Sequence, residues 1–423
     1  MSTSTNSPDL RSWIEVSPDS EFPIQNIPFG IFSTEGGSAR AGTALGEYVI
    51  DLSVLQDADL LHIPGLPWGV FKQKTLNTFI GLGKNITVPL RERVIELFSE
   101  GNTELHDNIE LRHNCIIPRD EVKMHMPVHV GDYTDFYSSE QHAFNVGCMF
   151  RDPDNALLPN WKHLPVGYHG RASSIVISGT DVKRPRGQQK PEDSAPVYGA
   201  SRLLDFELEM AFIIGKGTEL GSTLSTKEAE EHIFGLCIFN DWSARDIQKW
   251  EYVPLGPFLA KNFASSISPW IVTLEALEPF RVAGKKQNPK VLPYLEFSGK
   301  GNYDIDLEVY IQPEESSAKK VSHSNFKYMY WNMQQQLAHH TVNGCNINPG
   351  DMMASGTISG PKEHQYGSML ELSWRGTKPI PMPDGSERKF IQDGDTVVMK
   401  GYAKKGNLKI GFGEVSTKIL PAD

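Results

Sequence analysis

The sequence predicts a mainly β, α+β fold built from two unequal units. Strand-like runs outnumber helical patterns, and the few helices do not alternate with strands as a doubly wound sheet would require. Up to residue 122 no chemically active residue types gather, whereas the remainder is longer and rich in glycine and proline. We therefore expect a supporting unit over residues 1–122 and a larger, mixed, mostly β unit over residues 123–423.

The bulk composition excludes several classes of protein. The chain has 423 residues, 39% of them hydrophobic and 22% charged, which is typical of a globular protein with a large core. A formal net charge of −11 argues against nucleic acid or an anionic membrane as the main partner. No apolar run approaches the roughly 20 residues that a membrane span needs.

The cysteine pattern bears on the cellular compartment. The four cysteines, Cys115, Cys148, Cys237 and Cys345, are scattered and show no CxxC spacing. This pattern favours buried free thiols over a disulfide framework. The N-terminus also lacks the basic and apolar regions of a secretory signal, so we expect a cytoplasmic protein.

The expected helices and strands follow from the spacing of apolar residues and from the turn and capping residues between them. Residues 28–55 alternate short apolar runs with glycine-rich turns, which indicates a small β-rich region. The expected helices cover residues 89–100, residues 225–235 after the capping box of Ser225 and Glu228, residues 243–252 and residues 326–342. The main strand-like runs cover residues 174–178, 206–214, 236–240, 303–311, 369–374 and 396–400.

One stretch brings four chemically useful side chains close together in the sequence: Asp135, Tyr137, His142 and Arg151. A carboxylate can hold a hard cation, an imidazole can take a proton near neutral pH, and a guanidinium can bind a substrate carboxylate. By itself the stretch is equally typical of a hydrated loop. Its functional interpretation depends on three later segments.

The second segment contains two glutamates in an apolar strand. Side chains alternate along a strand, so Glu207 and Glu209 share one face, about 7 Å apart. Two buried carboxylates without partners would repel each other and cost several kcal/mol or have to take up a proton, and a bound cation removes this problem. Asp304, Asp306 and Glu308 alternate in the same way, but their acidic face continues into polar sequence, which indicates plain solvent exposure.

The third segment ends an apolar strand at Asp241 and opens a helix two residues later. Asp241 could simply cap that helix. Yet Arg245, Gln248 and Tyr252 fall at i, i+3 and i+7, so one helix face carries hydrogen-bond donors where a core-facing helix would carry leucine. Lys261 follows inside an otherwise apolar loop.

The fourth segment pairs a glycine-rich turn, residues 355–360, with a carboxylate at position 371. The backbone of such a turn can approach a ligand closely. Glu371 lies among apolar neighbours in an expected strand, so it needs a partner, and an imidazole is a natural one. Walker A, GxSxG and HExxH motifs are all absent from the sequence.

Together these segments resemble the fumarylacetoacetate hydrolase (fumarylacetoacetase) family. The resemblance lies in residues 132–151, 155–176, 204–212, 239–263 and 355–361. It implies an N-terminal SH3-like barrel, a catalytic domain of the mixed β-roll type and assembly as a homodimer. It also implies hydrolysis of a small-molecule substrate, fumarylacetoacetate, to fumarate and acetoacetate, the last step of tyrosine and phenylalanine catabolism.

The resemblance also implies roles for individual residues. The catalytic cation, calcium or magnesium, would be bound by Asp135, Glu207, Glu209 and Asp241. A second magnesium would use Asp241, the backbone of Lys261, and Ser265, where we expect threonine in the family. His142 would be the general base, paired with Glu371, and Arg245, Gln248 and Lys261 would support the leaving carbanion. The substrate would be held by Tyr137, Arg151, Tyr168, Gln248, Tyr252 and Thr357.

The proposed chemistry is also consistent with the residue types alone. Four carboxylates without clustered cysteine or histidine favour a hard cation, which can chelate the two oxygens of a β-diketone as a Lewis acid. His142, oriented by Glu371, would take a proton from the water that attacks the carbonyl next to the fumaryl group. The leaving group would then be the metal-bound enolate of acetoacetate.

Two alternatives stay open from the sequence. An acylpyruvate hydrolase, or a diketo-acid decarboxylase or isomerase, would resemble the chain at Glu207, Glu209 and Asp241, but such enzymes generally lack the long N-terminal region and the DFYSSxQH block. A non-enzymatic protein with a structural calcium site is the second alternative. Such a site would not need the donors of Arg245, Gln248 and Lys261.

Overall fold

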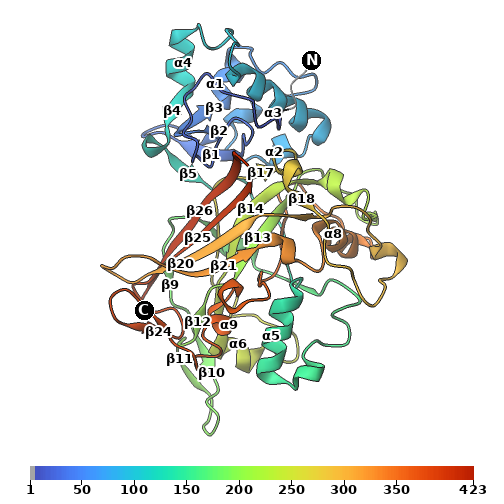
Figure 1. Ribbon diagram of the computed structural model, residues 1–423, viewed down its shortest axis with the longest axis vertical. Helices are drawn as coiled ribbons and strands as arrows, with labels where there is room; N and C mark the ends of the chain where they lie inside the picture. Colours follow the sequence, from blue (N-terminus) through green and yellow to red (C-terminus); the bar gives the residue numbers. More distant parts are fainter. Residues whose placement is uncertain (1–4) are drawn as a thin grey trace.

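A computed structural model describes residues 5–423 of the protein (Figure 1). A smaller N-terminal unit, blue in Figure 1, lies at one end of a larger unit in which long strands run side by side. The observed fold is therefore a sheet-rich α+β fold, as predicted. Within residues 5–423, no helix combines the length and the apolar character that a membrane crossing requires.

The N-terminal unit is built on one antiparallel sheet with the order β4-β3-β2-β1-β5. Its strands are β1 (Phe29–Ser33), β2 (Arg40–Leu45), β3 (Tyr48–Asp51), β4 (Ile116–Pro118) and β5 (Lys123–His125). Its helices are α1 (Leu52–Asp57), α2 (Asn77–Ile80), α3 (Lys84–Phe98) and α4 (Ile109–Cys115). Helix α3 begins earlier than predicted. Pro89 suggested a first turn, but it lies inside the helix.

Two finer predictions concern this unit. Strands β4 and β5 lie at opposite edges of the sheet, so its pairing does not close, and the SH3-like barrel stays a prediction. The predicted boundary between residues 122 and 123 also stays a prediction. Strand β5 begins directly after that boundary and pairs with β1.

The larger unit contains two main sheets. The first has the order β7-β6-β22-β13-β14-β16-β8, and β17 also pairs with β14. Its strands are β6 (Tyr133–Phe136), β7 (Gly167–His169), β8 (Ile175–Ile177), β13 (Leu208–Ile214), β14 (Ile233–Asp241), β16 (Ser265–Ile267), β17 (Val272–Thr273) and β22 (Met352–Ala354). The second sheet has the order β21-β20-β25-β26-β9 and contains β9 (Val182–Lys183), β20 (Asp306–Gln312), β21 (Lys319–Asn325), β25 (Thr396–Lys405) and β26 (Leu408–Leu420).

Short strand pairs and helices complete the unit. The pairs are β10 (Arg186–Gln189) with β11 (Val197–Ala200), β12 (Leu204–Asp205) with β15 (Ser243–Ala244), β18 (Arg281–Val282) with β19 (Asn302–Tyr303), and β23 (Ile380–Pro381) with β24 (Glu387–Arg388). The α-helices are α5 (Glu140–Phe150), α6 (Arg245–Glu251), α7 (Leu274–Leu277), α8 (Met333–Thr341) and α9 (Met369–Leu372).

Strand β13 separates two hydrophobic cores. Its residues Met210 and Phe212 point into a core that also contains Leu307 and Met399 of the second sheet. The alternate residues, such as Ile213, point into a core shared with the N-terminal unit. Because both faces are covered, the strand is apolar almost throughout, as is typical of a buried strand. Glu209 lies on this buried strand, so its carboxylate has little access to solvent.

The predicted helix over residues 225–235 is wrong. Ser225 and Glu228 do form the reciprocal hydrogen bonds of a capping box. Only one short 3₁₀ turn follows, however, and β14 begins at Ile233. The apolar run from Ile233 onwards pairs with β13, so burial in the central sheet outweighs the local capping signal.

Three other local predictions need correction. Residues 369–374 are not a strand, because Ser368 caps the short helix α9 there. The helix expected over residues 326–342 is interrupted, and only α8, capped by Asn332, is an α-helix. The acidic face of β20 is not uniformly exposed: Glu308 is buried, where it accepts hydrogen bonds from Lys320 and Tyr310.

Candidate active site

Four buried carboxylates meet at one end of the central sheet. They come from neighbouring elements: Asp135 from β6, Glu209 from β13, Asp241 from the end of β14, and Glu207 from the residue before β13. One carboxylate oxygen from each lies within 4.8 Å of the others. Like charges this close are unfavourable in a buried site, so the cluster requires positive charge.

Two basic side chains supply part of that charge. The Lys261 ammonium donates to Glu207 and, at 2.6 Å, to Asp241. The Arg245 guanidinium donates to Glu207 at 2.6 Å. Although burial alone would raise the pKa of Glu207, Lys261 and Arg245 bring that pKa below its ordinary value. The negative charges of Glu207 and Asp241 are therefore balanced by side chains of the protein.

Asp135 and Glu209 lack this compensation. Asp135 Oδ1 and Glu209 Oε1 are buried, and no group within residues 5–423 forms a hydrogen bond with either atom. Burial, followed by the charge of Asp241, holds the pKa of Asp135 well above its usual range, and burial with Asp135 does the same for Glu209. An acidic oxygen set with two such oxygens fits a hard divalent cation, which prefers carboxylate ligands. The four residues could hold a metal ion.

Neutral groups hold the remaining oxygens of the cluster. Tyr168 donates its hydroxyl to Asp241 Oδ2 at 3.0 Å, and Ser265 donates to Asp241 Oδ1 at 3.1 Å. The backbone N–H of Gly356 donates to Glu209 Oε2 at 2.9 Å. Gly356 has a φ of +75°, and a Cβ there would lie 2.2 Å from the carbonyl oxygen of Phe136. The glycine-rich turn thus approaches Glu209 in a way that other residues could not.

His142 and Glu371 are in contact although 229 positions separate them. His142 Nδ1 lies 2.7 Å from Glu371 Oε2, and both side chains are buried. His142 lies on α5, which begins at the cap residue Ser139, and Glu371 lies on α9. Burial would raise the pKa of Glu371, but His142 and several hydrogen bonds lower it instead.

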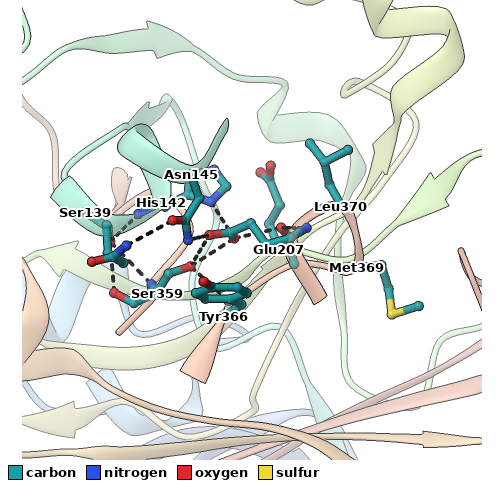
Figure 2. A network of polar contacts seen from close by, with 12 residues as sticks. Ser139, His142, Asn145, Glu207, Ser359, Tyr366, Met369 and Leu370 are labelled. Atoms are coloured by element: carbon teal, nitrogen blue, oxygen red, sulfur yellow. Dashed lines mark hydrogen bonds and ion pairs between the residues drawn. The ribbon is translucent and has the colours of Figure 1, made fainter. Parts of the chain in front are cut away.

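The Glu371 carboxylate is surrounded by hydrogen-bond donors. Asn145 donates its amide to Oε1 at 2.8 Å, Ser368 donates to Oε2 at 2.8 Å, and the Ser359 hydroxyl lies 2.9 Å from both oxygens. Figure 2 shows His142, Asn145 and Ser359 within this single network. The His142 imidazole also contributes to the lowered pKa of Glu207, so the network lies close to the acidic cluster.

Each of the residues predicted to bind a substrate carboxylate has its own contacts within the protein. Arg151 ends α5 and donates to the carbonyl oxygen of Ala156 at 2.6 Å. Tyr168 contacts Asp241, while the ring of Tyr137 packs edge-on against His142 with 5.3 Å between ring centroids. A shared role of these three side chains in binding a substrate carboxylate stays a prediction. Burial raises the pKa of Tyr137, and the charge of Arg151 partly opposes this change.

The other predicted substrate residues differ in exposure. Gln248 accepts a hydrogen bond from Arg245 at 3.1 Å, so the two lie on one face of α6 as predicted. Tyr252 follows α6 and is 53% exposed, whereas Thr357 is buried. Asp241 does not cap α6, whose cap position is Ala244.

Sequence reasoning missed several residues of the site. Asn145 lies one helical turn after His142, so the i, i+3 spacing could have placed it beside Glu371. Asp205 lies two positions before Glu207, and strand alternation could have placed it on the same face. Ser359 and Ser368 carry no comparable signal, because their positions depend on loops and on the short helix α9.

Comparisons with known proteins define the family. The family model described as "Fumarylacetoacetate (FAA) hydrolase C-terminal" matches residues 133–420, and the model described as "Fumarylacetoacetase N-terminal" matches residues 25–127. The first match lies in the larger unit and contains all the predicted site residues, and the second covers most of the N-terminal unit. The chain belongs to the fumarylacetoacetase family.

Particular relatives match along nearly their whole length. The chain is 54% identical to fumarylacetoacetase of Homo sapiens over 414 residues, which cover 97% of this chain and 99% of the relative. It is 54% identical to fumarylacetoacetase of Dictyostelium discoideum over 421 residues, covering 98% and 99%. A solved fumarylacetoacetate hydrolase from Exiguobacterium antarcticum shares the fold, with a TM-score of 0.54, 18% identity and coverage of 93% and 99%.

The acidic cluster predicts how metal binding responds to a single change. Glu209→Gln removes one negative charge from the cluster but keeps the side-chain volume. Because carboxylate charge sets affinity for hard cations, binding of Ca²⁺ and Mg²⁺ should weaken by about 10–100-fold. Isothermal titration calorimetry of metal-depleted protein measures both affinities.

Asp306→Asn is the matched control for this prediction. Asp306 belongs to the acidic strand β20, where it contacts His323 and Asn325 and is partly exposed. Metal affinity should stay at the wild-type value in this variant. Equal affinities for the wild type and Glu209→Gln would contradict a metal role for the cluster.

Proposed function

We propose that the acidic cluster and the His142–Glu371 pair together hydrolyse the carbon–carbon bond of fumarylacetoacetate, releasing fumarate and acetoacetate. The family assignment supports this substrate. The observation that carries the proposal is the adjacency of two complementary parts. One part is a buried oxygen set that suits a hard cation, and the other is a histidine held by a carboxylate.

The His142–Glu371 contact supports a general-base role. With Nδ1 donating to Glu371, the Nε2 atom of His142 is left as an acceptor that can take a proton from water. Glu371 then stabilises the imidazolium that forms. Asn145 and Ser368 hold the carboxylate in place, so the ring keeps one orientation and one tautomer.

The bond changes follow from this arrangement. Water adds to the carbonyl carbon next to the fumaryl group as His142 removes its proton. The adjacent carbon–carbon bond then breaks, fumarate forms, and the electron pair leaves with the acetoacetate carbon, which is later protonated. Lys261 and Arg245 place positive charge beside Glu207, where they can stabilise the developing enolate together with Gln248.

The proposed cation is Ca²⁺ or Mg²⁺, held by Asp135, Glu207, Glu209 and Asp241. When bound, it would supply Lewis-acid activation of the diketone oxygens. We also propose a second magnesium at Asp241, the Lys261 backbone and Ser265, supported by the 3.1 Å contact between Ser265 and Asp241. Substrate would be held by Tyr137, Arg151, Tyr168, Gln248, Tyr252 and Thr357.

Three further proposals concern the state of the protein. A cytoplasmic location is supported by four free cysteines, of which Cys115 and Cys237 are buried. An SH3-like barrel in the N-terminal unit is supported by its consecutive short antiparallel strands. A division of the chain into two units, which we place at residues 1–122 and 123–423, is supported by two separate family-model matches, although these adjoin between residues 127 and 133.

The proposed activity predicts a metal-dependent loss of substrate. Fumarylacetoacetate absorbance should fall on addition of the protein, stop falling after treatment with a chelator, and fall again when excess Ca²⁺ or Mg²⁺ is supplied. An acylpyruvate assayed at the same concentration should be turned over far more slowly. Full activity in metal-free protein, or preference for the acylpyruvate, would contradict the proposal.

The histidine and glutamate should behave as one unit. His142→Ala and Glu371→Gln should each lower kcat by about 10²–10⁴-fold, because each removes general-base catalysis. The double variant should fall no more than about threefold below His142→Ala, since effects within a unit do not add. Steady-state kinetics with metal-saturated protein test this.

An exposed glutamate serves as the control for the pair. Glu363 lies near Glu371 in the sequence but pairs with Lys378 at the surface, so Glu363→Gln should keep the wild-type kcat. Metal binding should survive in all of these variants. Losses that multiply cleanly in the double variant would show that the two residues do not act together.

We also propose a homodimer, supported by apolar side chains exposed after α6. Val253 is 68% exposed, Leu255 is 96% exposed and Phe258 is 60% exposed. Exposed apolar patches of this kind commonly mark association surfaces. Light scattering should therefore give twice the chain mass of 47.2 kDa. Leu255→Asp with Phe258→Asp should shift the protein toward monomer, and a wild-type monomer would contradict the proposal.

A further inference from the structure

Asp205 contacts segments that carry the acidic cluster and the His142–Glu371 pair. It is the last residue of β12 and is fully buried. Its strand pairs with β15, directly before Arg245. Two residues further along the chain, Glu207 forms a bridge to Ser368, directly before α9. The segment around Asp205 therefore touches both parts of the site.

The Asp205 carboxylate accepts hydrogen bonds from both sides. Arg245 Nε donates to Oδ2 at 2.8 Å, and the same guanidinium reaches Glu207 through its other end. The backbone N–H groups of Met369 and Leu370 donate to Asp205 at 2.6 Å and 3.1 Å. Figure 2 shows Met369 and Leu370 beside the network that contains His142 and Glu207.

These donors have few other partners. The first N–H groups of a helix lack acceptors within the helix, and α9 is only four residues long. Its N-terminal residues Met369 and Leu370 therefore depend on Asp205 for their hydrogen bonds. Arg245 likewise needs a second carboxylate to fix the plane of its guanidinium. Burial raises the pKa of Asp205, and the Arg245 guanidinium opposes this change.

We propose that Asp205 is a positioning residue that fixes the spacing between the general base and the acidic cluster. It acts through Arg245 on Glu207 and through α9 on Glu371. Glu371 is the third residue of α9, so a displacement at the start of that helix moves its carboxylate relative to His142. The catalytic part of this inference rests on the proposed function.

The test compares Asp205→Asn with a chemically matched variant elsewhere. Asp51 is also fully buried, also accepts from two backbone N–H groups at the start of a helix, Ser53 and Val54, and also pairs with an arginine, Arg40. It belongs to the N-terminal unit. Asp51→Asn therefore makes the same local change without touching the site.

Asp205→Asn should lower kcat by about 10–100-fold, as is typical for residues that orient catalytic groups. KM should change by less than about threefold, because Asp205 does not touch the substrate and the groups that it positions act in the transition state. Asp51→Asn, compared per folded molecule, should keep the wild-type kcat. Equal kcat values for the wild type and Asp205→Asn, or equal losses in the two variants, would overturn the proposal.

A measurement on the wild type needs neither activity nor a folded variant. The amides of Met369 and Leu370 should exchange with deuterium as slowly as those of β13, because Asp205 protects them. Exchange as fast as in the exposed loop at residues 192–196 would contradict the proposed contact between Asp205 and α9. A wild type that failed to hydrolyse fumarylacetoacetate would instead refute the proposed function, and slow exchange would still support the contact to α9.

Discussion

Negative charge concentrated in a buried place is the constraint on which the site depends. Four carboxylates lie with oxygens within 4.8 Å of one another, in surroundings that penalise every charge. The protein offsets part of this cost with Lys261 and Arg245, which contact Glu207 and Asp241. It leaves Asp135 and Glu209 short of partners. Because part of the negative charge stays unbalanced, the cluster suits a cation of high charge density.

The surrounding fold keeps these groups from moving apart to relieve their repulsion. Strand β13 is covered on one face by the second sheet and on the other by the N-terminal unit. Side chains such as Phe212 and Ile213 each contribute roughly 1.5–3 kcal/mol by burial, so the strand is strongly fixed. The N-terminal unit therefore supports the site without supplying any of the residues that we assign to it.

Much of the site could be predicted because strand alternation and residue chemistry are local properties. Glu207 and Glu209 stand two positions apart in an apolar run, and Asp241 ends another such run. The capping box at Ser225 predicts a helix that does not form. Its local hydrogen bonds are present, but the apolar residues from Ile233 onwards pair with β13 instead. The sequence predicts a strand at Glu371 because the four residues of α9 are too few to show helical periodicity. The position of Arg151 depends on the carbonyl of Ala156, which no sequence pattern specifies.

The pairing of β22 has a consequence for the order in which the protein matures during synthesis. Strand β22 joins β6 to β13, so residues 352–354 separate two strands that were made more than a hundred residues earlier. A nascent chain that has reached Asp241 already contains all four acidic residues, yet it lacks the strand that sets Asp135 beside Glu209. Loop closure over such separations is slow compared with local structure formation. The acidic cluster is thus complete only after residues 352–354 have been made.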